Sequence, residues 1–398
     1  MRRRASALFA TACVAATSFG LQPPLWASAE DSERASLRAE LGVEYDTNAQ
    51  RTELVGNTNP PIIASPLARG VITGQLSDRI ADAQTIALAV TFGGKLFAKP
   101  EARTENVGIL STGVQWRARL NERYNLGLGG AYYEAFQSAD AASVSSAADQ
   151  RGDFRSLAPT ARLARALGAG ADVALSGGYR WLVFKPNPDY TFAGPTGALD
   201  LRWVNEDPDA GVDWELGGGV GYERRQFDGH ALVKGTCTGA TLGLMCPPTP
   251  NTVGTTRLDD LYSGHAEITR TGAVLLGLGY VLQWNQSNSI GETLQRHFLS
   301  LRLAAALPLG IYVAARGELL IARYADPVVL AAGTGTQSYY PDIDRENRSS
   351  LRVELSRTLT DNLQLIARYT VYVNELGDSV GRYHRQTALL CLAFTAEK

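Results

Sequence analysis

The sequence is poor in the side chains on which metalloproteins and many enzymes depend. Among its 398 residues are only four histidines and four cysteines, and neither type recurs at the spacing of metal ligands. Its net charge is −2, with basic residues scattered along the chain, and this distribution is not that of a nucleic-acid-binding protein. A glycine-rich run at Gly217–Gly219 lies inside an expected strand, so it is not a phosphate-binding loop. We therefore expect no metal, no cofactor, no nucleic-acid partner and no enzymatic activity.

Long apolar runs are also missing beyond the N-terminus, where a transmembrane helix would need about 18 consecutive apolar residues. At the N-terminus itself, Arg2–Arg4 precede an uncharged apolar stretch over Ala5–Leu21, and Ala27–Ala29 form an A-x-A site. These features predict a secretory signal peptide over residues 1–29, cleaved after Ala29. The alternatives are an uncleaved membrane anchor, for which the run is short, and a lipoprotein site at Cys13, which would split the run.

Alternation with a period of two is the dominant pattern in the rest of the chain. Apolar residues alternate with charged residues or glycine over 37–45, and the pattern recurs over 214–223 and 351–356. Such alternation places the two kinds of side chain on opposite faces of a β-strand. Several segments run for about 12 to 15 residues, longer than most soluble strands and sufficient for a tilted strand to cross a bilayer. We count about 16 strands, including a weak one at Leu67–Leu76.

The expected connections are short on one side and long on the other. Short turns are predicted at 120–122, 167–170, 270–272, 307–310 and 360–362, and long polar loops at 48–65, 137–152, 227–257 and 325–347. Short periplasmic turns and long external loops are typical of outer-membrane barrels, in which aromatic residues gather near the strand ends. The predicted fold class is all-β. Residues 30–398 are expected to form one transmembrane antiparallel β-barrel in the lipid bilayer of a cell outer membrane.

The polar face of these strands is expected to line the lumen, because lipid requires an apolar exterior. The rule assigns to the lumen Arg38, Glu40, Glu44, Arg117, Arg162, Arg180, Asp200, Arg202, Glu215, Glu223, Glu267, Arg302, Arg316, Glu318, Arg352, Glu354, Arg368 and Arg385. Charges of opposite sign often alternate along one strand, so neighbouring strands can form ion-pair ladders. The face is either the wall of a water-filled conduit or a structural wall of mutually satisfied charges. Its near balance of signs argues against strong ion selectivity.

Two cysteines and one polar cluster are further candidate sites. Cys237 and Cys246 share a Gly/Thr/Pro-rich loop and are candidates for a disulfide in an oxidising compartment, with two free thiols as the alternative. His265 and Glu267 share one strand face and, with Ser263, suggest a serine hydrolase site, but we interpret them as a chance cluster.

The two ends of the expected barrel carry the motifs of a known group. The segment Gly42–Asn48 reads GVEYDTN, and the segment Tyr383–Phe394 is an apolar-alternating final strand. They resemble the first and last strands of outer-membrane barrels of the exopolysaccharide-export and surface-lipoprotein-assembly groups. The resemblance implies an export barrel working with a separate periplasmic partner. This chain departs from that pattern by having no room for a helical-repeat scaffold and by continuing over Thr395–Lys398 after its last aromatic residue.

The leading functional hypothesis is a conduit across the outer membrane, either porin-like or a polysaccharide or solute export channel. The alternatives are a plugged barrel with a surface-structural or adhesion role and an outer-membrane enzyme.

Overall fold

The wall of the protein consists of sixteen long strands. The computed structural model describes residues 34–50, 52, 54–55, 61–137, 153–185, 188–207, 212–233, 249–250, 255–325, 349–373, 376–377 and 381–397. The long strands are β1 (Arg34–Asp46), β3 (Ser65–Ala81), β4 (Gln84–Phe97), β5 (Val107–Arg119), β6 (Tyr124–Gln137), β7 (Phe154–Gly168), β8 (Ala171–Phe184), β9 (Phe192–Asp207), β10 (Val212–His230), β13 (Thr256–Thr271), β14 (Val274–Ser287), β15 (Leu294–Leu307), β16 (Ile311–Tyr324), β17 (Ser349–Thr360), β18 (Leu363–Val373) and β21 (His384–Glu397).

Short elements complete the described chain. They are β2 (Leu54–Val55), β11 (Leu232–Val233), β12 (Thr249–Pro250), β19 (Leu376–Gly377), β20 (Gly381–Arg382) and the 3₁₀ turns η2 (Pro100–Glu105), η4 (Pro188–Tyr190) and η5 (Pro308–Gly310). Within the described residues, none of the helical segments has the length and apolarity needed to cross a membrane.

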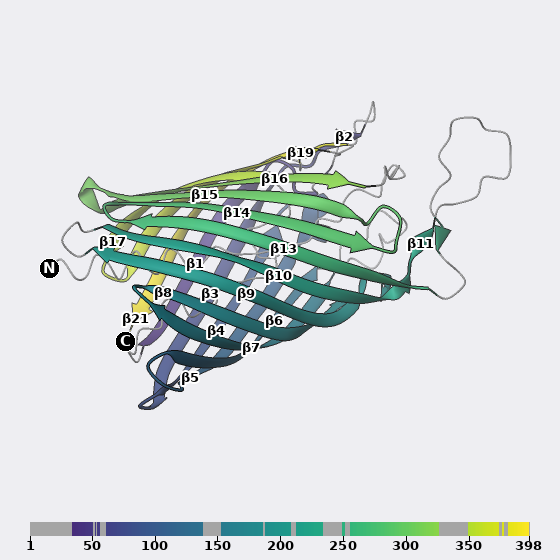
Figure 1. Cartoon of the computed structure of the whole chain (residues 1–398). Helices are drawn as coiled ribbons and strands as arrows, with labels where there is room; N and C mark the ends of the chain where they lie inside the picture. Colours follow the sequence, from purple (N-terminus) through teal and green to yellow (C-terminus); the bar gives the residue numbers. More distant parts are fainter. Residues whose placement is uncertain are drawn as a thin grey trace.

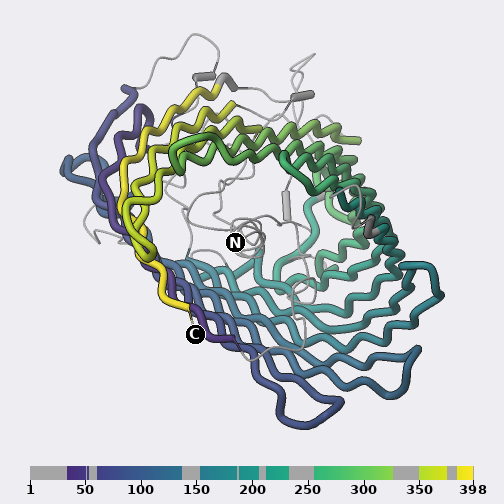
Figure 2. Tube along the Cα trace, turned by 90° about the vertical axis from the view of Figure 1, so that its left-hand side faces the viewer, coloured from purple at the N-terminus to yellow at the C-terminus, as the bar shows by residue number. Residues whose placement is uncertain are grey.

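The strands close into a barrel. Each long strand pairs antiparallel with the long strands before and after it, and the last strand, β21, pairs with the first, from Ser36↔Glu397 to Asp46↔Thr387. The tilted strands wrap around one axis (Figure 1), and in Figure 2 the first and last strands lie side by side in the ring. Closure leaves the long strands without a free edge. The predicted 16-strand antiparallel barrel is therefore confirmed.

The predicted turns join consecutive strands at one end of the barrel, and the weak segment Leu67–Leu76 lies within β3. The β7–β8 turn depends on glycine, because Gly170 has a φ of +75° and a Cβ there would collide with the carbonyl oxygen of Val204. The loop expected over 227–257 begins later than predicted, since β10 continues to His230. The alternation of buried and exposed side chains in β10 continues through this segment. Its buried Phe227 packs against Phe192 of β9, with a ring-centroid distance of 5.2 Å.

The outer face of the barrel is apolar. Leu41, Val43 and Val220 are 73%, 65% and 60% exposed, and many other leucines and valines on the outside of the wall are similarly uncovered. Trp181, Trp203, Trp214 and Trp284 lie on this face near the ends of their strands. An apolar surface of this extent is stable only against lipid. The architecture is that of a transmembrane β-barrel with an aromatic girdle.

Candidate functional site

The charged residues assigned to the inner face all lie on the covered side of their strands. Each is half-buried or buried, whereas many of their apolar neighbours along the strand, such as Leu163, Leu301 and Leu351, are exposed. In β1, for example, Glu44 is 4% exposed between Val43 and Tyr45, which are 65% and 50% exposed. The alternation in the sequence therefore places these charges away from the outer, lipid-facing surface.

Several of these charges pair along one strand, in addition to the ladders expected between strands. Arg38 Nε lies 3.0 Å from Glu40 Oε1 within β1, and Arg316 pairs with Glu318 within β16. Glu40 also lies 3.9 Å from a guanidinium nitrogen of Arg368 on β18. A nitrogen of Arg69 on β3 is at the same 3.9 Å distance. One glutamate is thus surrounded by three arginines where β1 closes onto its neighbours.

Other charges pair across strands instead. Arg202 Nε lies 2.6 Å from Glu215 Oε1, and Arg302 lies 3.4 Å from Glu267 Oε2. These pairs join β9 to β10 and β15 to β13, and their side chains are 25–41% exposed. Asp200 and Arg202 alternate in sign along β9 but form no ion pair with each other among the described contacts, since Arg202 pairs with Glu215 on the neighbouring strand.

Three further pairs join different strands, whereas Arg117 contacts a residue of its own strand. Arg162 lies 3.8 Å from Asp200, Arg180 lies 3.1 Å from Glu223, Arg368 lies 2.8 Å from Glu354, Arg117 donates to Gln115 at 3.3 Å, and Arg352 is half-buried on β17. The inner wall is thus a mosaic of opposite charges in mutual contact.

Two fully buried ion pairs were missed by the sequence analysis because only one member of each had been assigned. Lys95 Nζ lies 3.1 Å from Glu44, with side-chain exposures of 4% and 3%. Arg385 Nε donates to both oxygens of Asp46, at 3.0 and 2.9 Å, and both residues are at most 1% exposed. The one sequence feature that could have indicated the Asp46–Arg385 pair is the position of Asp46 at the end of the first alternating segment. The second pair ties the first strand to the last at the external end.

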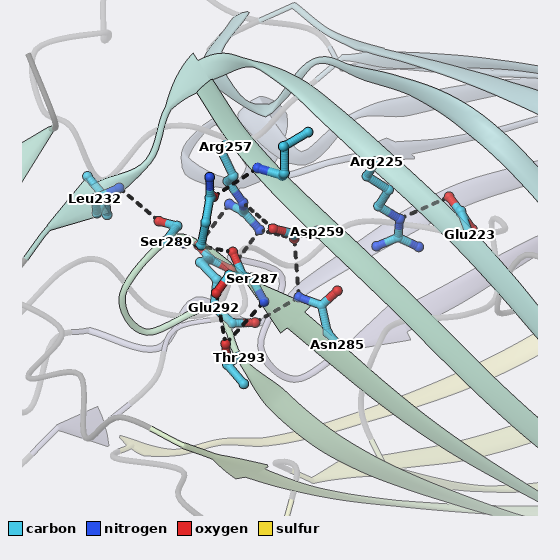
Figure 3. A network of polar contacts seen from close by, with 12 residues as sticks. Glu223, Arg225, Leu232, Arg257, Asp259, Asn285, Ser287, Ser289, Glu292 and Thr293 are labelled. Atoms are coloured by element: carbon cyan, nitrogen blue, oxygen red, sulfur yellow. Dashed lines mark hydrogen bonds and ion pairs between the residues drawn. The ribbon is translucent and has the colours of Figure 1, made fainter. Parts of the chain in front are cut away.

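A polar network lies at the external ends of β10, β13 and β14 (Figure 3). Arg257 binds Asp259 at 2.7 Å and Glu292 at 2.9 Å, and its guanidinium carbon lies 4.1 Å from the ring centroid of Phe227. Asn285 Nδ2 donates to the backbone oxygen of Glu292 at 2.8 Å. These contacts hold the β14–β15 loop against the wall.

Burial raises the pKa of Glu292, and the nearby charge of Asp259 raises it further against the attraction of Arg257. A carboxyl whose pKa is raised by folding contributes most stability below its unfolded pKa of about 4.3, and this contribution is lost as pH rises through the folded-state pKa. We therefore expect Glu292→Gln, which stays neutral, to gain stability relative to the wild type as pH rises from about 4 to 7. Urea unfolding in detergent micelles, followed by tryptophan fluorescence, measures the difference.

The matched control for this prediction is Glu122→Gln, in the exposed turn at the other end of the barrel. It should show no such pH-dependent difference. A constant difference for Glu292→Gln across the same pH range would contradict the prediction.

Not all of the inner face is polar. Ile366, Leu389, Cys391 and Ala393 form a buried apolar cluster on β18 and β21. The expectation of an apolar outside and a polar inside is therefore too simple for β21, which is apolar on both faces. Cys391 is a packing residue there, 3% exposed.

The possible hydrolase residues do not form a catalytic array. His265 Nε2 lies 3.8 Å from Asp200, and among the described contacts no hydrogen bond joins Ser263 to His265. The string 377–381 reads GDSVG, a G-x-S-x-G sequence, and its residues 378–380, which include Ser379, lie outside the described part of the chain. Within the described residues, no cluster of histidine, cysteine or carboxylate side chains is suited to a metal ion.

Some predicted sites lie outside the described residues. They are the signal peptide with its cleavage site at Ala29, the Cys237–Cys246 pair, and most of the long loops. These remain predictions from the sequence.

Comparisons with known proteins give structural likeness alone. No protein-family model matches the chain, and no curated protein matches it significantly. Its structure is similar to OprB of Pseudomonas putida, with 10% identity over 92% of this chain and 94% of that chain and a TM-score of 0.48. It is also similar to CdiB from Acinetobacter baumannii, with 11% identity over 90% and 60% of the two chains and a TM-score of 0.44. A FadL homologue from Pseudomonas aeruginosa has 14% identity over 92% and 90% of the chains and a TM-score of 0.33.

The closed wall and apolar exterior define the class of the protein. Barrels whose lipid-facing band is flanked by aromatic residues belong to outer membranes. The chain is an outer-membrane β-barrel protein.

Proposed function

We propose that this barrel is a passive conduit for hydrophilic solutes across the outer membrane. The supporting observation is the set of opposite charges on its inner face whose side chains stay partly exposed, such as Arg202 at 40%, Glu215 at 34% and Glu267 at 41%. Charged side chains that are not fully buried need water beside them. A barrel of about 16 strands is wide enough to hold an aqueous channel.

The charge arrangement supports a conduit with little ion selectivity. Because Arg202 and Arg302 each face a carboxylate, at 2.6 and 3.4 Å, the fields of these charges largely cancel beyond about one Debye length, roughly 10 Å at 0.1 M salt. A strongly selective pore instead uses rings of one sign.

Planar-bilayer recording of the purified, refolded chain tests the proposal. We expect stable single-channel steps and a reversal potential near zero in a salt gradient. Protein that inserts and shows heat-modifiable migration but gives no conductance steps would overturn the conduit.

The finer form of the proposal is an export channel for a polysaccharide or other solute, assisted by a periplasmic partner. Its support is the likeness of the two terminal strand motifs to export barrels. Crosslinking in intact cells from Glu122, in a short periplasmic turn, to another envelope protein would support a partner. If no crosslink forms from several turn positions, the result would favour a porin-like conduit without a periplasmic partner.

A second candidate is a plugged barrel with a structural or adhesive role at the surface. The observation that favours it is the heavy burial of inward polar residues at the external end, including Asp46, Asp259 and Arg385 at 0–1% exposure. The conductance experiment separates the two candidates, because a plugged barrel inserts without conducting.

A further inference from the structure

A groove of about 300 Å³ opens on the outer wall of the barrel, on the surface that faces lipid. It is lined by Tyr280, His297, Leu299, Leu319, Ile321 and Arg323, from β14, β15 and β16, which lie side by side in Figure 1. The lining residues are at outward positions: Tyr280 and Leu299 are 40% and 41% exposed, whereas the alternate residues of β16, Leu320 and Ala322, are 1% exposed. The groove therefore does not belong to the inner face.

The groove has an apolar floor and a polar rim, arranged along the membrane normal. The strand register places Tyr280, Leu299 and Leu319 in one row, deeper in the membrane. Nearer the external end, the next rows contain Leu282, His297 and Ile321, then Trp284, Gln295 and Arg323. Arg323 is the last residue but one of β16, so the rim lies at the external membrane interface. This is the depth at which aromatic and basic side chains meet lipid headgroups.

The rim carries a positive charge that has no acidic partner among the described residues. Arg323 is exposed and forms no ion pair with a described residue, in contrast to the inward arginines of the neighbouring strands, Arg302 and Arg316. The Tyr280 hydroxyl lies 2.7 Å from His297 Nδ1. If the hydroxyl donates, the ring proton of His297 is on Nε2 and is available to an acceptor. The rim thus offers a guanidinium and, in that tautomer, a ring N–H, both of which bind phosphate oxygens.

We propose that this groove binds a phosphorylated lipid of the outer leaflet, with an acyl chain against Leu299, Leu319 and Ile321 and a phosphate at Arg323 and His297. The site is separate from the conduit, and its occupant is selected by charge complementarity at the rim and by apolar contact below it. The phosphate of the bound lipid would neutralise the positive charge of Arg323 at the interface.

Native mass spectrometry of the delipidated, full-length protein in detergent tests the site. The probes are bis-phosphorylated lipid A, the same lipid without phosphates, and inorganic phosphate. We expect one lipid A to be retained, with the dephosphorylated lipid at least about ten-fold weaker, because a charge-assisted bond to phosphate is lost. Inorganic phosphate alone should not displace lipid A, because it lacks the acyl contacts.

Two variants address the two halves of the groove. Arg323→Glu should weaken retention of lipid A by about ten-fold or more, and Ile321→Trp should weaken both lipids by filling the floor. The matched control is Arg357→Glu, an exposed outward arginine of β17 near the opposite end, which should leave retention unchanged. Heat-modifiable migration confirms that each variant is folded, and unchanged conductance separates this site from the proposed channel.

Three outcomes would overturn the proposal. Equal retention by Arg323→Glu and the wild type would remove the phosphate site. Full displacement by inorganic phosphate would indicate an anion site without acyl recognition. A lipid-free oligomer that either groove variant dissociates would assign the groove to an interface between copies of the chain.

Discussion

Replacing Arg385 with alanine is expected to destabilise the barrel by about 3–5 kcal/mol, because the carboxylate of Asp46 would remain buried without its partner. Asp46 is 0% exposed and Arg385 1% exposed, so water cannot easily take the place of the guanidinium. The pair joins β1 to β21, so its loss weakens the seam at which the barrel closes. Urea titration of folding into detergent micelles, followed by tryptophan fluorescence, gives the free energy of unfolding.

A double variant separates the buried charge from the general cost of substitution. Asp46→Asn with Arg385→Met removes both charges, and the new amide oxygen can still accept the backbone N–H of Asn48, which donates to Asp46 at 2.9 Å. We expect it to recover most of the lost stability, since replacing both members of a buried pair is often close to neutral. Arg357→Ala, in an exposed position, should change stability by less than about 0.5 kcal/mol. If the double variant is as unstable as Arg385→Ala, the buried unpaired charge is not the cause of the lost stability.

Removing two inner-face arginines is expected to convert a weakly selective conduit into a cation-selective one. Arg202→Ala with Arg302→Ala leaves Glu215 and Glu267 without the cations that now lie 2.6 and 3.4 Å away. Two charges about 4 Å apart interact by roughly 1 kcal/mol in water, which corresponds to about a five-fold preference. Reversal potentials in a low-salt gradient measure the change. The preference should shrink at 1 M salt, where the Debye length is about 3 Å.

The opposite substitutions provide the internal control. Glu215→Gln with Glu267→Gln should shift the preference towards anions, and the swap Arg202→Glu with Glu215→Arg should keep it near the wild-type value. If the selectivity changes with neither the positive nor the negative substitutions, permeating ions do not pass these residues. That result would contradict the proposed conduit but not the barrel fold.

The local pattern of the chain was sufficient to predict the wall but not its contacts. Alternation predicted which side chains of β1 share a face, among them Arg38 and Glu40, which the structure brings into contact. It did not predict that Arg202 pairs with Glu215, because that contact depends on the register between two strands. A shift of one residue would have turned the partner to the other face.

The sequence by itself determined an all-β transmembrane barrel, its strand number and the side of each strand that carries charge. These properties depend on a period of two and on the positions of turns, both of which are local. Only the tertiary structure decided that Asp46 meets Arg385 across 339 positions of the chain, and that three strands enclose a groove with a cationic rim. Both the ion pair and the groove depend on the closed barrel, because the register between strands brings together residues that no local pattern relates.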